Sequence, residues 1–217
     1  MQYIFIHGLG QDSSSWNQTV SHMSLENKIV CPDLCSFLKR DEASYSSLYK
    51  HFSQYCDEIS EPINLCGLSL GGVLALNYAI DNPSKVKSLI LIAAQYQMPK
   101  LLLKVQNTIF RFMPKRVFEA MGISKKGFIK LTTSMMDIDF SKALNSISCP
   151  TLIICGEKDI ANKKASMAMA DQIVNSQLHF VKDAGHEINK DNPKELAEVI
   201  NSFCEIWGSD EINNNKG

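Results

Sequence analysis

The sequence predicts an α/β fold, in which a mainly parallel sheet of about six strands carries helices on both faces. Short apolar runs alternate along the chain with longer helical patterns, as in a parallel sheet. The runs are continuously apolar, which is typical of strands that helices cover on both sides. The length of 217 residues, with 45% hydrophobic and 21% charged residues, suits one globular domain.

Six apolar runs are the expected strands, and five further stretches have helical patterns. The strands are expected at 3–6 (YIFI), 28–31 (KIVC), 63–66 (INLC), 88–93 (SLILIA), 151–155 (TLIIC) and 178–181 (LHFV). The helices are expected at about 14–25, 44–59, 70–81, 162–175 and 193–207. Pro83, Pro150 and Pro193 lie at the boundaries of these elements, where proline is best tolerated.

Residues 96–147 interrupt the alternation. They contain no convincing strand, but they hold five of the nine Met and five of the ten Phe residues, with nine Lys or Arg against three Asp or Glu. We expect a helical cap insertion over the C-terminal edge of the sheet, although ordinary surface helices with core residues would give the same pattern. The core then comprises 1–95 and 148–207, and residues 208–217 form a polar C-terminal tail.

Charge and cysteine content narrow the class of protein. The formal net charge of -1 shows no basic surplus over the whole chain, which argues against nucleic-acid binding. The seven cysteines form no C-x-x-C pair, so we expect buried, reduced thiols and neither a zinc site nor a redox site. We see no signal peptide, and no apolar run reaches the ~18 residues of a membrane span. These features predict a cytoplasmic protein without a transmembrane segment.

The motif LCGLSLGGVLALNYA, residues 65–79, places Ser69 where a predicted strand changes into a predicted helix. A nucleophile on such a sharp turn has strained backbone angles, and Gly67 and Gly71 remove side chains that would collide with the strand or helix. The helix that begins at Leu70 directs its positive end toward the reacting group. The motif therefore indicates a nucleophilic serine, and a helix N-cap serine with incidental glycines is the competing interpretation.

A serine nucleophile needs a general base and a carboxylate that orients the base. Among the five histidines, His186 follows the last predicted strand in a loop and can reach the same sheet edge as Ser69. The others end the first predicted strand or lie within predicted helices or strands: His7, His22, His51 and His179. We therefore predict that His186 is the base.

Asp159 is the expected acid because it directly follows the fifth predicted strand, in the segment IICGEKDIA. Glu157 lies nearer to the strand end but is less well placed to project toward the histidine. Asp183 is only three residues before His186 on the same loop. Both remain rivals of Asp159. The order Ser69, Asp159, His186 is the chain order expected for this type of site.

Two backbone N–H donors are also needed to stabilise the oxyanion of a tetrahedral intermediate. The N–H of Leu70, next after the nucleophile, is one candidate, and the N–H of Leu9, in the loop after the first strand, is the other. His7 and Gly8 shape this loop so that its backbone approaches the site. A phosphate-binding loop is the competing interpretation of the glycines, but no G-K-[ST] follows either glycine cluster.

Six segments resemble the α/β-hydrolase superfamily, in particular its capped, single-domain, esterase-like members. In chain order they are FIHGLGQDSSSW, VCPDL, LCGLSLGGVLALNYA, LILIAA, CPTLIICGEKD and DAGHEI. The resemblance spans nearly the whole chain outside 96–147. It implies acyl-enzyme chemistry, in which Ser69 attacks a carbonyl carbon and His186 takes and returns the proton. It also implies that the protein uses no cofactor and no metal.

Two departures from the family pattern affect the expected fold. The family usually has an antiparallel strand pair before the strand that ends in HG, and this chain starts at that strand. We therefore expect an α/β-hydrolase fold without the N-terminal strand pair. After PDL the family commonly has a glycine-containing turn, whereas this chain has CSFLKR, in a loop that borders the pocket. Neither departure affects Ser69, Asp159 or His186.

The leading functional hypothesis is a serine hydrolase that cleaves a small carboxylic ester or thioester with an apolar acyl part, since Met and Phe side chains line such cavities well. The surplus of positive charge in 96–147 has two interpretations: it attracts an anionic substrate, or it forms only a solvated face. A carbon–carbon bond hydrolase or a lyase acting on a dicarbonyl acid would use the same three residues. A weakly catalytic ligand receptor or a catalytically idle interaction module would have the same fold.

Overall fold

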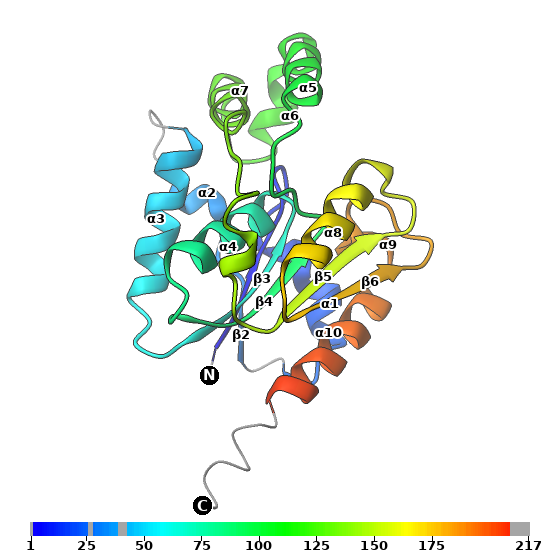
Figure 1. Ribbon diagram of the computed structural model, residues 1–217. Helices are drawn as coiled ribbons and strands as arrows, with labels where there is room; N and C mark the ends of the chain where they lie inside the picture. Colours follow the sequence, from blue (N-terminus) through cyan, green and yellow to red (C-terminus); the bar gives the residue numbers. More distant parts are fainter. Residues whose placement is uncertain (1, 26–27, 39–42, 209–217) are drawn as a thin grey trace, which may run out of the picture.

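A six-stranded sheet lies at the centre of the computed structural model, which describes residues 2–25, 28–38 and 43–208 (Figure 1). The strand order is β2-β1-β3-β4-β5-β6, and every neighbouring pair is parallel. The strands are β1 (Tyr3–Ile6), β2 (Ile29–Val30), β3 (Ile63–Leu68), β4 (Val86–Ile92), β5 (Thr151–Gly156) and β6 (Ser176–Val181). The predicted α/β fold with six parallel strands is confirmed.

Helices separate and follow the strands. In chain order they are η1 (Ser13–Trp16), α1 (Asn17–Ser21), α2 (Leu34–Phe37), α3 (Tyr45–Asp57), α4 (Leu70–Asp81), α5 (Lys100–Phe112), α6 (Lys115–Glu119), α7 (Lys125–Ser134), η3 (Leu144–Ser146), α8 (Ile160–Gln172), α9 (Ile188–Asp191) and α10 (Pro193–Gly208). Helix α4 has the predicted bounds, and α3, α8 and α10 differ from theirs by at most three residues. The sequence predicts neither α2 nor α9, because four residues are too few for a periodic pattern.

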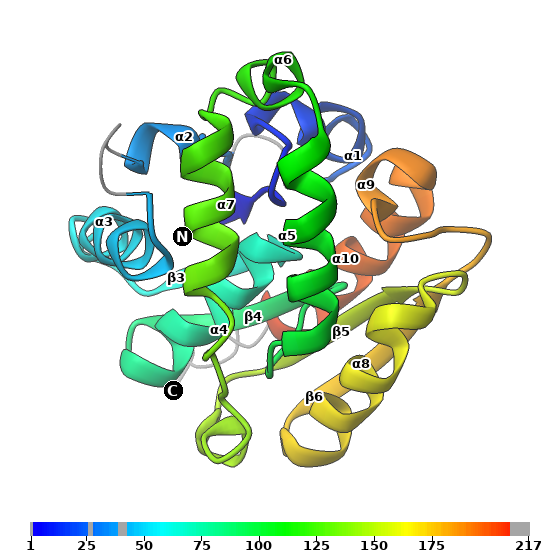
Figure 2. The same ribbon diagram turned by 90° about the horizontal axis from the view of Figure 1, so that it is seen from above.

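Residues 96–147, called the helical segment below, carry the α-helices α5, α6 and α7 above the carboxyl ends of the strands (Figures 1 and 2). Helices α5 and α7 run side by side across this end of the molecule, with α6 between them in the chain. The rings of Phe110, Phe118 and Phe128 lie with their centroids 5.1–6.2 Å apart and join the three helices. An isolated antiparallel bridge pairs Gln97 with Asp139, near the two ends of the segment.

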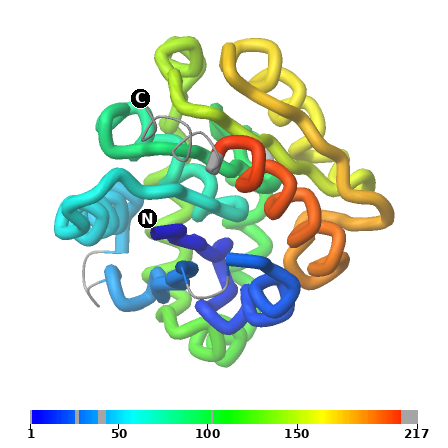
Figure 3. Tube along the Cα trace, turned by 90° about the horizontal axis from the view of Figure 1, so that it is seen from below, coloured from blue at the N-terminus to red at the C-terminus, as the bar shows by residue number. Residues whose placement is uncertain are grey.

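The strands present alternate side chains to two separate cores. In β1, Ile4 and Ile6 contact the core that includes α3, α4 and α8, while Tyr3 and Phe5 contact the core that includes α10. All four residues are at most 5% exposed. Figure 3 shows α1 and α10, the first and last helices, side by side on one face of the sheet. Burying each such side chain contributes about 1.5–3 kcal/mol to the free energy of folding. Packing on both faces therefore stabilises the sheet.

The helix predicted over about 14–25 is helical only as far as Ser21, and its first turn is a 3-10 helix. The segment forms the 3-10 turn η1 and the five-residue helix α1, so that His22 lies just past the helix end. Asp12 accepts hydrogen bonds from the amide and hydroxyl groups of Ser14, and its carbonyl oxygen accepts from Ser15. These bonds cap the N-terminus of η1, so the helical stretch begins at Ser13. Strand β2 is also shorter than predicted, because Pro32 follows closely and lacks an N–H group.

Three further sequence predictions concern thiols, membranes and the tail. The seven cysteines are free thiols, and four of them are buried: Cys56, Cys66, Cys155 and Cys204. Among the described helices, none is long and apolar enough to cross a membrane. Of the predicted tail at 208–217, the structure describes Gly208, the last residue of α10, and residues 209–217 lie outside the described residues.

Candidate active site

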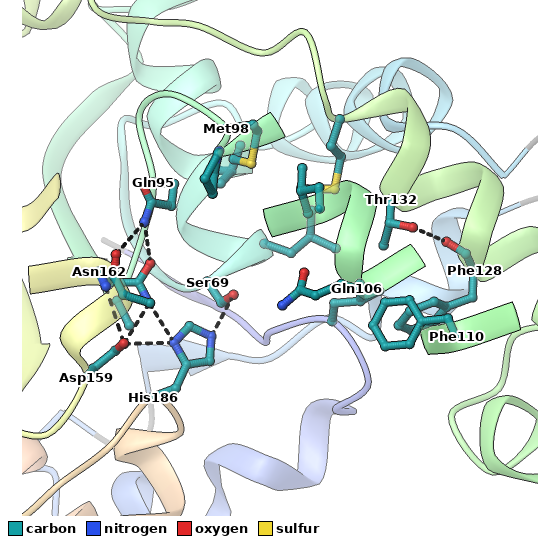
Figure 4. A pocket seen from close by; sticks show the side chains of 18 residues that line it. Ser69, Gln95, Met98, Gln106, Phe110, Phe128, Thr132, Asp159, Asn162 and His186 are labelled. Carbon is teal, nitrogen blue, oxygen red and sulfur yellow. Dashed lines mark hydrogen bonds and ion pairs between the residues drawn. The ribbon is translucent and has the colours of Figure 1, made fainter. Parts of the chain in front are cut away.

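The ends of three strands bring the predicted site residues to one edge of the sheet. Ser69 directly follows β3, Asp159 lies three residues after the end of β5, and His186 lies five residues after the end of β6. Strands β3 to β6 are consecutive in the sheet and parallel, so these loops lie along the same rim. Figure 4 shows the three side chains in a row.

Ser69 lies on a strained turn between β3 and α4. Its backbone has φ 53° and ψ -113°, and such positive-φ conformations cost about 1–3 kcal/mol in a residue other than glycine. A Cβ atom on Gly67 would lie 2.3 Å from the backbone of Gly71, and one on Gly71 would lie 2.2 Å from the carbonyl oxygen of Ile6. The turn therefore requires both glycines. The Ser69 side chain makes no capping hydrogen bond to α4, which argues against the N-cap interpretation.

His186 connects the serine to a carboxylate. Its Nε2 atom lies 3.0 Å from Ser69 Oγ, and its Nδ1 atom lies 2.9 Å from Asp159 Oδ2. Because an ionised carboxylate only accepts hydrogen bonds, Nδ1 carries the ring proton and Nε2 can accept the hydroxyl proton of Ser69. This is the tautomer that a general base for Ser69 requires.

Asp159 is buried, with 6% of the residue exposed, and it also caps α8 by accepting from the amide of Asn162. Burial alone would raise the pKa of this carboxyl group. Hydrogen bonds from His186 and Asn162 outweigh burial, so the pKa of Asp159 lies below its ordinary value. Asp159 is therefore an anion at neutral pH and can orient the His186 ring.

The rival acids have other partners. Asp183 is exposed, and its carboxylate forms an ion pair with Lys158 at 3.0 Å. Glu157 is exposed, and its carboxylate accepts a hydrogen bond of 3.4 Å from the amide of Asp183. Within the part of the chain that the structure describes, Asp159 is the acid that hydrogen-bonds to His186.

Two amide side chains that no sequence motif marks extend this row of contacts. Asn162 Nδ2 donates to Asp159 Oδ2 at 2.7 Å and lies 3.0 Å from His186 Nδ1. Gln95 Nε2 donates to Asn162 Oδ1 at 2.7 Å (Figure 4). Asn162 could have been found from its place in the first turn of a helix that Asp159 caps, whereas Gln95 carries no comparable signal.

His7 and Gly8 belong to the loop after β1. The amide of Leu34 donates to His7 Nε2 at 2.9 Å, so the ring proton is on Nδ1, which donates to the carbonyl oxygen of Gly8, 2.9 Å away. His7 is 2% exposed. His7 therefore joins the loop after β1 to the start of α2, and it does not reach the three site residues.

Gln11 connects the same loop to the loop that carries His186. The side-chain amide of Gln11 donates to the carboxylate of Glu187 at 2.7 Å, and the backbone amide of Gln11 donates to the carbonyl oxygen of Gly8 at 3.2 Å. Between these contacts, Leu9 lines a cavity together with Leu70. The two predicted oxyanion-hole residues therefore lie at one cavity with Ser69.

This cavity of about 370 Å³ lies between the sheet edge and the helical segment (Figure 4). The segment contributes mainly apolar residues to it: Met98, Pro99, Leu103, Gln106, Phe110, Phe128, Thr132 and Met135. Apart from Asp159 and His186, the described residues that line the cavity include no acid, lysine, arginine or histidine. The cavity suits an uncharged, apolar group placed against Ser69.

Two curated relatives resemble the chain along most of its length. It is 20% identical over 249 residues to monoacylglycerol lipase ABHD6 of Homo sapiens, with 92% of this chain and 74% of that protein covered. It is 23% identical over 200 residues to the pimeloyl-[acyl-carrier protein] methyl ester esterase of Legionella pneumophila (strain Corby), with 79% and 81% covered.

Solved structures and a family model agree on the fold. The structure of MenH from S. aureus matches with a TM-score of 0.81 at 19% identity, covering 95% of this chain and 94% of that chain. At that identity the likeness concerns the fold alone. The family model described as "Alpha/beta hydrolase family" matches residues 3–199. The chain therefore belongs to the alpha/beta hydrolase family, and the protein is a hydrolase.

Proposed function

We propose that the protein is a serine hydrolase that cleaves a small carboxylic ester with an apolar acyl part through an acyl-enzyme. The observation that carries the proposal is the row of contacts from Ser69 Oγ through His186 to Asp159, at 3.0 and 2.9 Å, in the wall of an apolar cavity. The names of the two curated relatives, a lipase and an ester esterase, support ester cleavage. A thioester would react by the same steps.

In the proposed reaction, Ser69 Oγ attacks the carbonyl carbon of the ester, and its proton passes to Nε2 of His186. The bond between that carbon and the alcohol oxygen then breaks, and the leaving oxygen takes the proton from His186. Water attacks the acyl-enzyme with His186 again as the base. The carboxylic acid leaves, and the proton returns to Ser69 Oγ. Asp159 stays ionised throughout and holds the ring in position.

We assign the oxyanion hole to the N–H groups of Leu9 and Leu70. Both residues line the cavity beside Ser69. Leu70 is the first residue of α4, so its amide is among the N-terminal donors that have no acceptor within the helix. Removing one such donor from an oxyanion hole costs about 2.7–4 kcal/mol of transition-state stabilisation.

In this proposal the helical segment is a cap over the core formed by 1–95 and 148–207, and it supplies the acyl pocket. The lining favours an ester over a dicarbonyl acid as the substrate. A dicarbonyl acid carries a carboxylate, and a buried carboxylate is stabilised most strongly by a cationic partner. Among the described lining residues there is no lysine or arginine to provide that partner.

We also propose a cytoplasmic location, a small-molecule substrate, and catalysis without a metal, cofactor or nucleic-acid partner. The seven free thiols support a reducing compartment. The proposed chemistry uses only side chains and backbone amides of the chain itself.

A fluorophosphonate probe, which labels activated serines, tests the nucleophile. We expect the wild-type protein to be labelled, and we expect Ser69→Ala to lose both labelling and ester turnover. Ser202→Ala is the matched control, because Ser202 lies exposed on α10, and it should keep both. Circular dichroism should be unchanged in Ser69→Ala, which loses one hydroxyl and no apolar volume. Wild-type labelling of Ser69→Ala would refute the assignment.

A substrate panel separates ester cleavage from carbon–carbon bond cleavage and from ligand reception. Esters with acyl chains of increasing length are compared with vinylogous diketo acids, and products are identified by mass spectrometry. We expect turnover of the esters. Cleavage of the diketo acids alone would favour the carbon–carbon hydrolase, and a ligand that stays bound at one per protein without product release would favour the receptor.

A further inference from the structure

Helix α5 presents apolar side chains on two opposite sides. On the inner side, Leu103 and Phe110 line the cavity beside Ser69. On the outer side, four side chains recur at intervals of four, four and three residues, which places them in one row. These residues, called the outer stripe below, are 77%, 51%, 55% and 85% exposed: Leu101, Val105, Ile109 and Phe112.

The outer stripe gathers more exposed apolar side chains in one place than a random scatter over the surface would give. Single exposed apolar residues are normal, whereas contiguous apolar patches mark interaction surfaces. Among the described residues, eight large apolar side chains are exposed, and the stripe contains four of them within a helix of 13 residues. The other four are dispersed over α8, α10 and the connection before β6: Ile160, Met167, Val174 and Ile206.

Specific contacts on the inner side hold α5 with the stripe facing outward. Asn107 is 5% exposed, accepts from Thr132 at 2.6 Å and donates to Thr133 at 3.1 Å, both on α7. Lys125 donates to the carbonyl oxygens of Arg111 and Met113, at 2.6 and 2.7 Å, where α5 ends. The stripe is therefore exposed because the helix is fixed in this orientation.

Cationic side chains accompany the stripe. Lys104 and Arg111 lie on α5 in the row next to it, and both are exposed. Within the described ranges, neither of them forms an ion pair, whereas Lys100 pairs with Asp137 at 2.8 Å. The whole helical segment has nine Lys or Arg against three Asp or Glu, although the chain as a whole has a formal charge of -1.

We propose that the outer stripe docks the protein on the surface of an anionic lipid bilayer. An apolar row with cations beside it is the pattern of helices that lie in the bilayer interface, where the apolar side chains enter the acyl region and the cations meet anionic headgroups. Helices α5 and α7 form the outermost layer at this end of the molecule (Figures 1 and 2), so the stripe is presented as a ridge.

Charge argues against a second copy of the chain as the occupant. A symmetric dimer through the stripe would bring two copies of the same cationic surface together, and like charges repel. An anionic bilayer instead attracts these cations. None of the described helices could cross a bilayer, so the contact is with the surface. Docking would place lipid one helix diameter, roughly 10 Å, from the active-site cavity.

Co-sedimentation with vesicles tests the proposal on the full chain. We expect binding to vesicles of phosphatidylcholine mixed with phosphatidylglycerol, and weak binding to phosphatidylcholine alone. The double variant Leu101→Ser and Phe112→Ser should lower binding at least tenfold. Val174→Ser is the matched control, since Val174 is 83% exposed and lies before β6, and it should bind as wild type does.

The charge contribution is tested separately. Lys104→Gln and Arg111→Gln should each weaken binding to the anionic vesicles by about fivefold and flatten its salt dependence. Lys164→Gln on α8 is the matched control and should have no effect. Circular dichroism checks that each variant is folded. We expect all of them to fold, because the substituted side chains are exposed.

Three results would overturn the proposal. The first is that the wild-type protein binds neither kind of vesicle, and the second is that the double variant binds as the wild type does. The third is a wild-type dimer in sedimentation velocity that Phe112→Ser converts to a monomer, which would assign the stripe to a second copy. Vesicle binding does not depend on catalysis, so Ser69→Ala should bind normally, and failure of the proposed function would leave this test unaffected.

Discussion

The carboxyl edge of the sheet and the helical segment meet at the same cavity but are held in place differently. Ser69 and Asp159 follow β3 and β5, which have hydrogen-bonded neighbours on both sides. Helices α5 and α7 of the helical segment pack on each other, Leu131 and Met135 of the segment join the core shared with β1 and α4, and the isolated bridge between Gln97 and Asp139 lies near the ends of the segment.

This difference separates two tasks in the proposed enzyme. The groups assigned to bond cleavage stand on strands whose displacement would break two cores. The groups assigned to the acyl pocket and the outer stripe stand on helices outside the sheet. We therefore expect substitutions at the edge to affect the rate or the fold, and substitutions in the segment to affect selectivity and surface binding.

Asp159→Asn should have the largest effect on activity. The amide cannot replace the carboxylate that fixes the His186 tautomer, and the same change in a known serine protease triad lowers kcat by about 10⁴-fold. We expect a loss of kcat/KM of about that size with a wild-type circular dichroism spectrum. Glu157→Gln is the matched control and should change ester turnover by less than about twofold. A larger loss in Glu157→Gln would show that the acid is misassigned.

Gly71→Ala should have the largest effect on stability. Its Cβ atom would lie 2.2 Å from the carbonyl oxygen of Ile6, so strand and helix must move apart, and we expect a loss of about 4 kcal/mol in the free energy of unfolding. By contrast, a Cβ atom on Gly127 in α7 would contact side chains and no backbone among its nearest neighbours, namely Ser124, Ile123 and Ala43 at 3.0, 3.3 and 3.4 Å. Because alanine favours helix, Gly127→Ala should remain within about 1 kcal/mol of wild type in urea denaturation.

The strands were predictable from sequence because burial on both faces selects continuous apolar runs, as in YIFI at β1. The helices of 96–147 were harder to place, because the apolar stripe of the amphipathic helix α5 is largely exposed, so periodicity alone does not show which side of α5 faces the cavity. The helix predicted over 14–25 ends at Ser21, where the amides of His22 and Met23 donate to carbonyl oxygens three residues earlier, and helix periodicity does not reveal this ending.

The residues of the site also differ in how well the sequence predicts them. Ser69 and His186 could be proposed because each stands in a short motif directly after a strand. Gln95 and Asn162 are 67 residues apart, and their amide contact exists only once β4 and β5 are paired. A side chain that acts through another side chain has no pattern of its own in the sequence.

Asn162→Leu should have a moderate effect on activity, and it tests the assignment of Asp159 as the acid. Burial of Asp159 would remain while one hydrogen bond to its carboxylate is lost, so the pKa of Asp159 should rise toward its ordinary value or above it. We expect kcat/KM to fall about tenfold, as for a hydrogen bond to a charged group. In the most acidic part of the pH–rate profile, where Asp159 becomes protonated, activity should be lost at a higher pH than in the wild type. Asn175→Leu, at an exposed amide distant from Ser69, should leave the profile unchanged, and an unchanged profile in Asn162→Leu would assign Asn162 a purely structural role.

The smallest effect is predicted for a Phe→Leu substitution, made once on the inner side and once on the outer side of α5. Phe110→Leu shortens a side chain that lines the cavity, whereas Phe112→Leu changes one that is 85% exposed. With soluble esters and no vesicles, Phe110→Leu should raise KM about threefold to tenfold for long acyl chains and leave short ones unaffected, since loss of a few carbon contacts is worth about 1–3 kcal/mol at most. Phe112→Leu should leave KM for both unchanged. Equal effects of the two substitutions on long-chain KM would contradict the assignment of separate inner and outer functions to α5, because only the inner side faces the proposed acyl pocket.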